Sequence, residues 1–276
     1  MKRLTILGGR GMLGTDLVKL TRSAGYQVEI LDLPDFDITD EIQLRDAVKR
    51  CKIIINCAAY TNVDQAEEEI IKCKAVNADV LTILGEAAVK NDSYVLHVST
   101  DFVFGNDSNR ELRETDAPSP LCVYGHTKLD GETNLQKSGC RCGIVRVEWS
   151  YGQHGNNFIS KIIELTEKLD TLKVINDQFG SPTWTMDSSR AIFCCMKQEV
   201  EGIYHFAANG YASRFEVAKF ILSELGIEKN MEPCSSEEFV TPARRPLNSR
   251  FDCSKIKPIL DFEIPNWCDS LHQFLT

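Results

Sequence analysis

The chain has 276 residues, of which 43% are hydrophobic and 26% charged, and its formal net charge is −9. This composition is typical of a globular protein, and a length of about 150 residues per domain predicts two domains. The acidic balance argues against a nucleic-acid-binding surface, which needs clustered basic residues. The apolar runs are far too short to span a bilayer, and no signal-peptide pattern is present. We therefore expect a cytoplasmic protein with neither a nucleic-acid partner nor a membrane partner.

The eleven cysteines and five histidines are scattered along the chain. No C-x-x-C pair occurs, and neither the spacing of Cys140 and Cys142 nor that of Cys194 and Cys195 is usual for zinc. An odd number of cysteines without a secretory signal is typical of reduced thiols. We therefore predict buried structural cysteines and no metal site.

The first half of the chain alternates short β-rich runs with stretches of helical spacing. The predicted strands are residues 4–7, 28–31, 53–55, 94–98 and 143–147, and the predicted helices are residues 12–24, 41–50, 67–90 and 125–136. This alternation predicts an α/β fold with a doubly wound parallel (Rossmann) sheet. Such sheets bind ligands at the carboxyl ends of their strands.

The pattern becomes irregular after about residue 150. Predicted helices at 158–169, 187–199 and 213–225 are separated by short strands at 172–175 and 203–206, before a tail rich in proline, serine and charge. We therefore predict a dinucleotide-binding domain at 1–148. A smaller, mainly substrate-binding domain at 149–276 is expected to be interleaved with the sheet, with parts of it returning there.

A glycine-rich loop follows the first predicted strand directly. Gly8, Gly11 and Gly14 give the spacing G-x-x-G-x-x-G before the first predicted helix. Residues without a Cβ allow a tight turn and a close approach to a pyrophosphate, which the free amides of the helix then bind. Asp32 ends the second strand, where a carboxylate accepts ribose hydroxyls and disfavours a 2′-phosphate. Because Arg10 could neutralise such a phosphate, NADH and NADPH both remain open.

A tyrosine and a lysine lie four residues apart at the start of the predicted helix at 125–136. Tyr124 and Lys128 share a helix face, and a neighbouring ammonium is expected to lower the pKa of the phenol. Such a phenol can protonate a carbonyl oxygen while hydride arrives at the carbon. Thr100, at the end of the fourth strand, can donate a hydrogen bond to the same oxygen. The order of these motifs predicts a carbonyl-reducing site.

The chain resembles the extended short-chain dehydrogenases/reductases, and within them the dTDP-4-dehydrorhamnose reductase family. The glycine loop and Y-x-x-x-K are shared by the whole superfamily, whereas the segments at 63–67 and 176–183 are specific to this branch. The further matching stretches are residues 37–40, 56–62, 99–104 and 245–249, so the resemblance covers nearly the whole chain.

The resemblance implies roles for particular residues. The cofactor would be contacted at its pyrophosphate by Gly11, Met12 and Leu13, near its adenine by Asp37 and Ile38, and after the third strand by Ala58, Ala59 and Tyr60. Thr100, Tyr124 and Lys128 would be catalytic, with Lys128 also holding the nicotinamide ribose. The sugar nucleotide would be contacted by Thr100, Asp101 and Trp149, and its phosphates by the region of Arg245.

Some of these residues also have purely structural interpretations. Trp149 could be a core aromatic, Asp101 could cap a turn, and Asp37 could cap a short helix. Arg245 could be a solvated surface charge. The chain also departs from the family at Glu148, where a small or hydroxyl residue usually precedes the tryptophan, so an unexpected carboxylate is predicted near the substrate contacts.

The resemblance implies an NADPH- or NADH-dependent reduction of the C4 ketone of dTDP-4-dehydro-L-rhamnose, giving dTDP-L-rhamnose. Two alternatives stay open: a sugar-nucleotide epimerase or dehydratase that retains NAD, and a regulatory subunit related to that of methionine adenosyltransferase. Magnesium is associated with some family members, but the sequence shows no ligand set for Mg²⁺. A homodimer also stays open.

Overall fold

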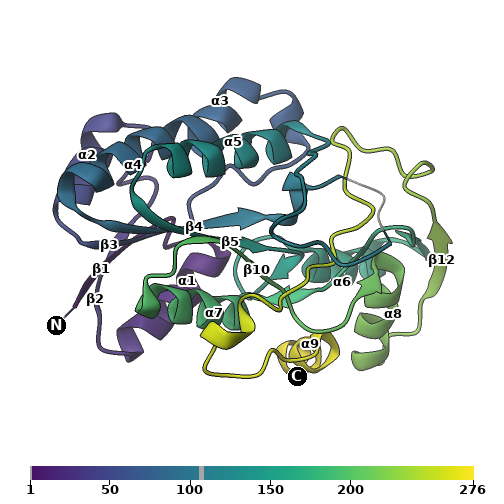
Figure 1. Ribbon diagram of the computed structural model, residues 1–276. Helices are drawn as coiled ribbons and strands as arrows, with labels where there is room; N and C mark the ends of the chain where they lie inside the picture. Colours follow the sequence, from purple (N-terminus) through teal and green to yellow (C-terminus); the bar gives the residue numbers. More distant parts are fainter. Residues whose placement is uncertain (1, 106–108) are drawn as a thin grey trace.

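The computed structural model describes residues 2–105 and 109–276, and a six-stranded parallel sheet forms its centre (Figure 1). The strands are β1 (Arg3–Leu7), β2 (Gln27–Leu31), β3 (Ile53–Asn56), β4 (Tyr94–Thr100), β5 (Arg141–Val147) and β10 (Gly202–Phe206). Their order is β10-β5-β4-β3-β1-β2. From β1 the chain adds β2 on one side and then β3 on the other, so the strand order switches between β1 and β3. The predicted doubly wound α/β fold is confirmed, and ligands are expected where the order reverses.

Helices cover both faces of this sheet (Figure 1). One face carries α1 (Met12–Ser23) and α7 (Thr185–Gln198), and the other carries α2 (Glu41–Lys49), α4 (Val80–Asn91) and α5 (Val123–Lys137). The strands are apolar because they are buried on both faces: Leu4 and Ile6 of β1 pack toward the α1 side, while Leu7 packs toward the α4 side. No helix in the described part of the chain is long and apolar enough to cross a bilayer.

The stretch at 67–90 is not the single α-helix that its periodicity predicts. It contains a 3₁₀ turn ending at Glu67 (η1, Gln65–Glu67), then α3 (Ile70–Lys74), a π-helical turn (η2, Ala75–Asp79) and α4. Within the π turn, the side chain of Asn77 accepts a hydrogen bond from Tyr60 N at 2.8 Å and donates one to Tyr60 O at 3.1 Å. These bonds hold the loop after β3 in place. The π turn thus positions Asn77 for a tertiary contact, which a helix pattern in the sequence does not predict.

Most of the remaining elements form a second cluster beside the carboxyl ends of the strands. They are β6 (Ser150–Tyr151), α6 (Phe158–Lys168), β7 (Thr171–Ile175), β8 (Phe179–Gly180), β9 (Thr183–Trp184), β11 (Ala212–Ser213), α8 (Arg214–Glu224), β12 (Asn230–Cys234) and α9 (Trp267–Leu275). The short turns η3 (Asp101–Val103) and η4 (Lys257–Ile259) instead contact α5 and α7. Sequence analysis missed β12 and α9. A separate apolar core holds α6, α8 and α9 together, whereas α7 and β10 lie with the central sheet. The division at residue 148 stays a proposal.

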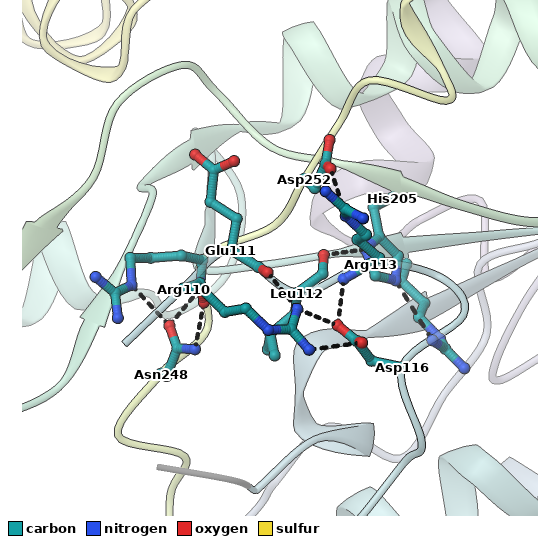
Figure 2. Close-up of polar contacts among 10 residues, drawn as sticks. Arg110, Glu111, Leu112, Arg113, Asp116, His205, Asn248 and Asp252 are labelled. Atoms are coloured by element: carbon teal, nitrogen blue, oxygen red, sulfur yellow. Dashed lines mark hydrogen bonds and ion pairs between the residues drawn. The ribbon is translucent and has the colours of Figure 1, made fainter. Parts of the chain in front are cut away.

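The segment at 110–116 is bound to the segment at 248–252, far away in the sequence (Figure 2). Leu112 N donates to Arg250 O at 2.7 Å, and Asp252 N donates to Leu112 O at 2.9 Å. The ring of His205, on β10, contacts Leu112 O at 3.0 Å. The C-terminal segment is therefore held against the end of the sheet.

A buried ion pair joins α5 to β5. Arg146 and Glu132 are each 1% exposed, and two hydrogen bonds of 2.9 and 2.6 Å join their side chains. We expect Arg146→Met to lower the free energy of unfolding by about 3–5 kcal/mol, because Glu132 is then buried without a partner. Adding Glu132→Leu should recover most of this loss. Urea unfolding of the three proteins checks this, and a cost of the single change below about 1 kcal/mol would contradict it.

Candidate active site

The glycine loop is shaped by two close approaches of backbone to backbone. Gly8 has φ +73°, and a Cβ on it would lie 2.6 Å from Ala58 N, in the segment after β3. A Cβ on Gly14 would collide with Gly8 O and lie 2.7 Å from Gly9 Cα. α1 begins directly after Gly11 with no side-chain cap and no acidic residue in its first turn. This is a cradle that glycine alone permits, and its amides fit a pyrophosphate.

Arg10 and Asp32 lie at the same corner of the loop. One Asp32 carboxylate oxygen accepts from Arg10 N at 2.8 Å and the other from Leu33 N at 2.9 Å. The Arg10 guanidinium donates to Leu33 O at 2.9 Å and forms an exposed ion pair of 2.5 Å with Asp35. A 2′-phosphate would therefore have to compete with Asp35 for Arg10, and the two opposing influences on the nicotinamide preference are both present.

The residues predicted near the adenine are held by local structure. Asp37 accepts hydrogen bonds from Thr39 N and Thr39 Oγ1 at 2.9 and 2.7 Å, which forms a turn. The N-cap of α2 is Asp40, not Asp37. Ile38 is buried in the core on the α4 side. The adenine contacts of Asp37 and Ile38 stay predictions.

Ala58, Ala59 and Tyr60 follow β3 directly beside the glycine loop. Ala58 N donates to Asn56 Oδ1 at 3.0 Å, while the Tyr60 hydroxyl donates to Glu69 Oε2 at 2.9 Å. The loop of cofactor candidates is thus fixed at both ends by side-chain hydrogen bonds.

Thr100, Tyr124 and Lys128 come from two neighbouring elements, the end of β4 and the first turns of α5. Thr100 Oγ1 donates to Asp101 Oδ1 at 3.0 Å and accepts from Phe102 N at 3.2 Å. Burial raises the pKa of Tyr124 above its usual value, and a hydrogen bond with Thr100 acts in the opposite direction. The expectation of a lowered pKa for this phenol is wrong, because burial is the largest influence on it. A phenol with a raised pKa stays protonated at neutral pH.

The ammonium group of Lys128 contacts two groups on β4. Lys128 is 2% exposed, donates to Val98 O at 2.7 Å and contacts His97 Nε2 at 3.2 Å. The other ring nitrogen of His97 lies 3.2 Å from Asn56 Nδ2. Burial lowers the pKa of Lys128 to about 8, and it keeps the pKa of His97 well below its usual value. His97 is therefore neutral beside the lysine.

Sequence analysis missed Asn56 and His97 as supporting residues. Both are completely buried polar side chains at the ends or within the apolar runs of β3 and β4. A polar residue within an apolar strand was the available signal, because buried polar groups need hydrogen-bond partners.

The predicted substrate contacts Asp101 and Trp149 lie near a second buried carboxyl group, that of Glu148. Asp101 is 2% exposed and accepts from Thr100 and from Ser249 Oγ, the latter at 2.5 Å, and burial raises its pKa. Trp149 has φ +40°, and its ring lies against Gly180, where a Cβ would be 2.6 Å away. Glu148 is 1% exposed, and neither of its carboxyl oxygens has a hydrogen-bond partner in the described part of the chain. Burial, followed by the charge of Asp101, raises the pKa of Glu148 well above its usual value.

Arg245 is partly buried and bound by an ion pair, so it is not a free surface charge. Its guanidinium donates to both carboxylate oxygens of Asp64 at 3.0 and 2.7 Å, and also to Thr241 Oγ1 and Ala243 O. Its predicted contact with substrate phosphates stays a prediction. No group of His, Cys, Asp and Glu residues able to hold a metal ion occurs within residues 2–105 and 109–276.

A family model described as RmlD substrate binding domain matches residues 1–276. The chain belongs to this family. It is 36% identical over 282 residues to the dTDP-4-dehydrorhamnose reductase of Aggregatibacter actinomycetemcomitans, with 97% of this chain and 96% of the relative covered. The enzyme of the same name from Salmonella typhimurium is 33% identical over 291 residues, with 99% and 97% covered. The resemblance inferred from the motifs is confirmed.

Solved structures of the family superimpose closely. A dTDP-4-dehydrorhamnose reductase from Bacillus anthracis, in complex with NADP, has a TM-score of 0.94 and 34% identity, with 99% of each chain covered. A reductase of that name from Clostridium acetobutylicum has a TM-score of 0.94 and 32% identity, with 99% and 98% covered.

The depressed pKa of Lys128 predicts a pH dependence of stability. The pKa of Lys128 is about 8 in the folded protein and 10.5 in an unfolded chain. At pH values between these two, Lys128 is protonated in the unfolded chain but largely deprotonated in the folded one. The free energy of unfolding therefore rises with pH in this interval. Relative to Lys128→Met, the wild-type protein should gain about 1 kcal/mol per pH unit from roughly pH 8 to pH 10. Urea unfolding of both proteins measures this, and a pH-independent difference would show that Lys128 keeps its usual pKa.

Proposed function

We propose that this chain is an NAD(P)H-dependent oxidoreductase that reduces the C4 ketone of dTDP-4-dehydro-L-rhamnose to dTDP-L-rhamnose. The observation that carries the proposal is the placement of Thr100, Tyr124 and the buried Lys128 at the same edge of the sheet as the glycine cradle. Relatives that are 33–36% identical over nearly the whole chain, and that are named dTDP-4-dehydrorhamnose reductase, support the substrate.

The cofactor fits the cradle that Gly8 and Gly14 leave open. Gly11, Met12 and Leu13 would hold its pyrophosphate, and Ala58, Ala59 and Tyr60 would border it from β3. Asp37 and Ile38 would lie near the adenine, and Lys128 would bind the nicotinamide ribose. When bound, a reduced nicotinamide supplies the hydride.

The protein's own part in the reaction is to deliver a proton and stabilise charge. As the C4 carbon is reduced, the carbonyl oxygen gains negative charge, and the Tyr124 hydroxyl donates its proton to that oxygen. The raised pKa keeps Tyr124 protonated until then. Lys128 lies one helical turn from Tyr124, and its charge would stabilise the resulting phenolate. The Thr100 hydroxyl, at the end of β4, would donate a hydrogen bond to the substrate carbonyl oxygen.

Thr100, Asp101, Trp149 and Arg245 would contact the sugar nucleotide. In this proposal residues 1–148 bind mainly the dinucleotide and residues 149–276 mainly the substrate, in a cytoplasmic enzyme. We assign no residue to Mg²⁺.

The principal enzymatic alternative is a sugar-nucleotide epimerase or dehydratase that retains NAD. A dTDP-glucose 4,6-dehydratase from Streptomyces venezuelae has a TM-score of 0.86 but only 21% identity, and so shares the fold alone. A regulatory subunit would bind a catalytic partner and would not need the catalytic trio. The two alternatives differ from the proposal in cofactor turnover, which makes turnover the decisive measurement.

The test is to supply dTDP-4-dehydro-L-rhamnose with NADPH or NADH and follow nicotinamide absorbance. We expect one cofactor to be oxidised per sugar reduced. Because Arg10 and Asp32 favour opposite cofactors, kcat/KM for the two should differ by less than about a hundredfold, or 2.7 kcal/mol. Arg10→Ala should selectively weaken NADPH. The absence of stoichiometric oxidation with either cofactor would reject the reductase.

Tyr124→Phe keeps the aromatic ring and removes the proton, so it tests the assigned mechanism. We expect kcat to fall by about 10²–10⁴-fold or more, while NADPH affinity is retained. Thr100→Val should cost less, since the proton source remains, and Lys128→Met should damage both kcat and cofactor affinity. Steady-state kinetics and cofactor titration measure these effects. Near-wild-type kcat in Tyr124→Phe with NADPH bound would show that another group donates the proton.

A further inference from the structure

Arg214 is a partly buried arginine beside the predicted substrate contacts, and its guanidinium lies at ion-pair distance from no carboxylate in the described part of the chain. It is the first residue of α8, and its Cζ lies 3.4 Å from the centroid of the Trp149 ring and 4.9 Å from that of Phe158. Across the described residues, its side chain forms no hydrogen bond and no ion pair. The arginine is therefore oriented by aromatic stacking, which leaves its five N–H donors available.

Two carboxyl groups lie within electrostatic range of Arg214 without pairing with it. Asp101 and Glu148 both act to raise its pKa, but neither forms an ion pair with its guanidinium in the described part of the chain. Arg245 adds a like charge. Burial lowers the pKa of Arg214 to about 10, so it remains a cation at neutral pH. A cation that is held by aromatic stacking, with its N–H donors available, is suited to bind an anion.

Arg245 is less suited to accept that anion by itself. Its two terminal nitrogens already donate to Asp64, Thr241 and Ala243, and 24% of its side chain is exposed. A phosphate would have to displace the Asp64 carboxylate to receive a bidentate bond. At Arg214 no such exchange is required.

We propose that Arg214, stacked on Trp149 at the start of α8, is the principal arginine that binds the diphosphate of the sugar nucleotide. Arg245 contributes its charge from behind its ion pair with Asp64. The planar fork of a guanidinium matches two phosphate oxygens, and the Trp149 ring orients that fork. Trp149 thus supports Arg214 as well as bordering the sugar. This inference rests on the proposed function, because it names the residue that recognises the nucleotide part of that substrate.

The test compares the binding of dTDP and of thymidine, which lacks the phosphates, by calorimetry. Arg214→Met should weaken dTDP binding at least about tenfold, since it removes a charge-assisted hydrogen-bond donor, and should leave thymidine binding within about twofold of wild type. Arg214→Lys keeps the charge without the fork, so its dTDP affinity should lie between the two. Arg245→Met should weaken dTDP binding less than Arg214→Met does.

Arg190 offers a matched control, because it also stacks on an aromatic ring from a helix. Its Cζ lies 3.9 Å from the centroid of the Phe262 ring, on the side of α7. Arg190→Met should leave dTDP affinity unchanged, and NADPH affinity should be unchanged in every variant. The inference is overturned if Arg214→Met binds dTDP within twofold of wild type, or if it loses thymidine or NADPH affinity as much as dTDP affinity. It is also overturned if Arg245→Met loses more dTDP affinity than Arg214→Met does, or if the wild-type protein does not bind dTDP.

The outcomes also separate this inference from the proposed reaction. If wild-type protein binds dTDP through Arg214 but does not reduce dTDP-4-dehydro-L-rhamnose, the reaction fails and the diphosphate site stands. If the ketone is reduced while dTDP affinity is insensitive to Arg214, the reaction stands and the assignment of Arg214 fails.

Discussion

The burial of one ammonium group is the constraint on which the arrangement of the site depends. Lys128 is 2% exposed, so its charge needs polar partners inside the protein, and Val98 O and His97 supply them. His97 in turn contacts Asn56, whose amide oxygen accepts from Ala58 N. Ala58 is the residue against which Gly8 fits without a Cβ. A single line of polar contacts therefore links the buried Lys128 on α5 to the backbone that forms the glycine cradle.

Burial also determines the protonation of the other titratable groups in the site. Burial raises the pKa of Tyr124, Asp101 and Glu148, and it lowers the pKa of Lys128 and His97. Every one of these shifts favours the neutral form. A phenol that keeps its proton, beside a lysine whose charge is poorly solvated, is suited to give that proton to an oxygen that becomes negative. Binding of an anion would then be supported mainly by the arginines.

The sequence was sufficient for those features that depend on local pattern. The strand before Gly8, the helix that begins at Met12 and the pairing of Tyr124 with Lys128 on one helix all follow from spacing. The partners of buried groups did not follow, because they come from distant segments. Asp64 and Arg245 are 181 residues apart, and nothing near either one predicts their ion pair. The pKa of Tyr124 was predicted in the wrong direction for the same reason, since burial cannot be read from a helix face alone.

The C-terminal segment has a consequence for the order in which the molecule is assembled. Arg245 binds Asp64, Ser249 binds Asp101, and the backbone around residue 251 pairs with Leu112. These contacts join residues 245–251 to groups that leave the ribosome much earlier. The strands up to β5 can form while the chain is still being made, but these contacts form only after synthesis is nearly finished. Nascent chains would thus form the glycine loop first, and would make the contacts with Asp64, Asp101 and Leu112 only as their final step.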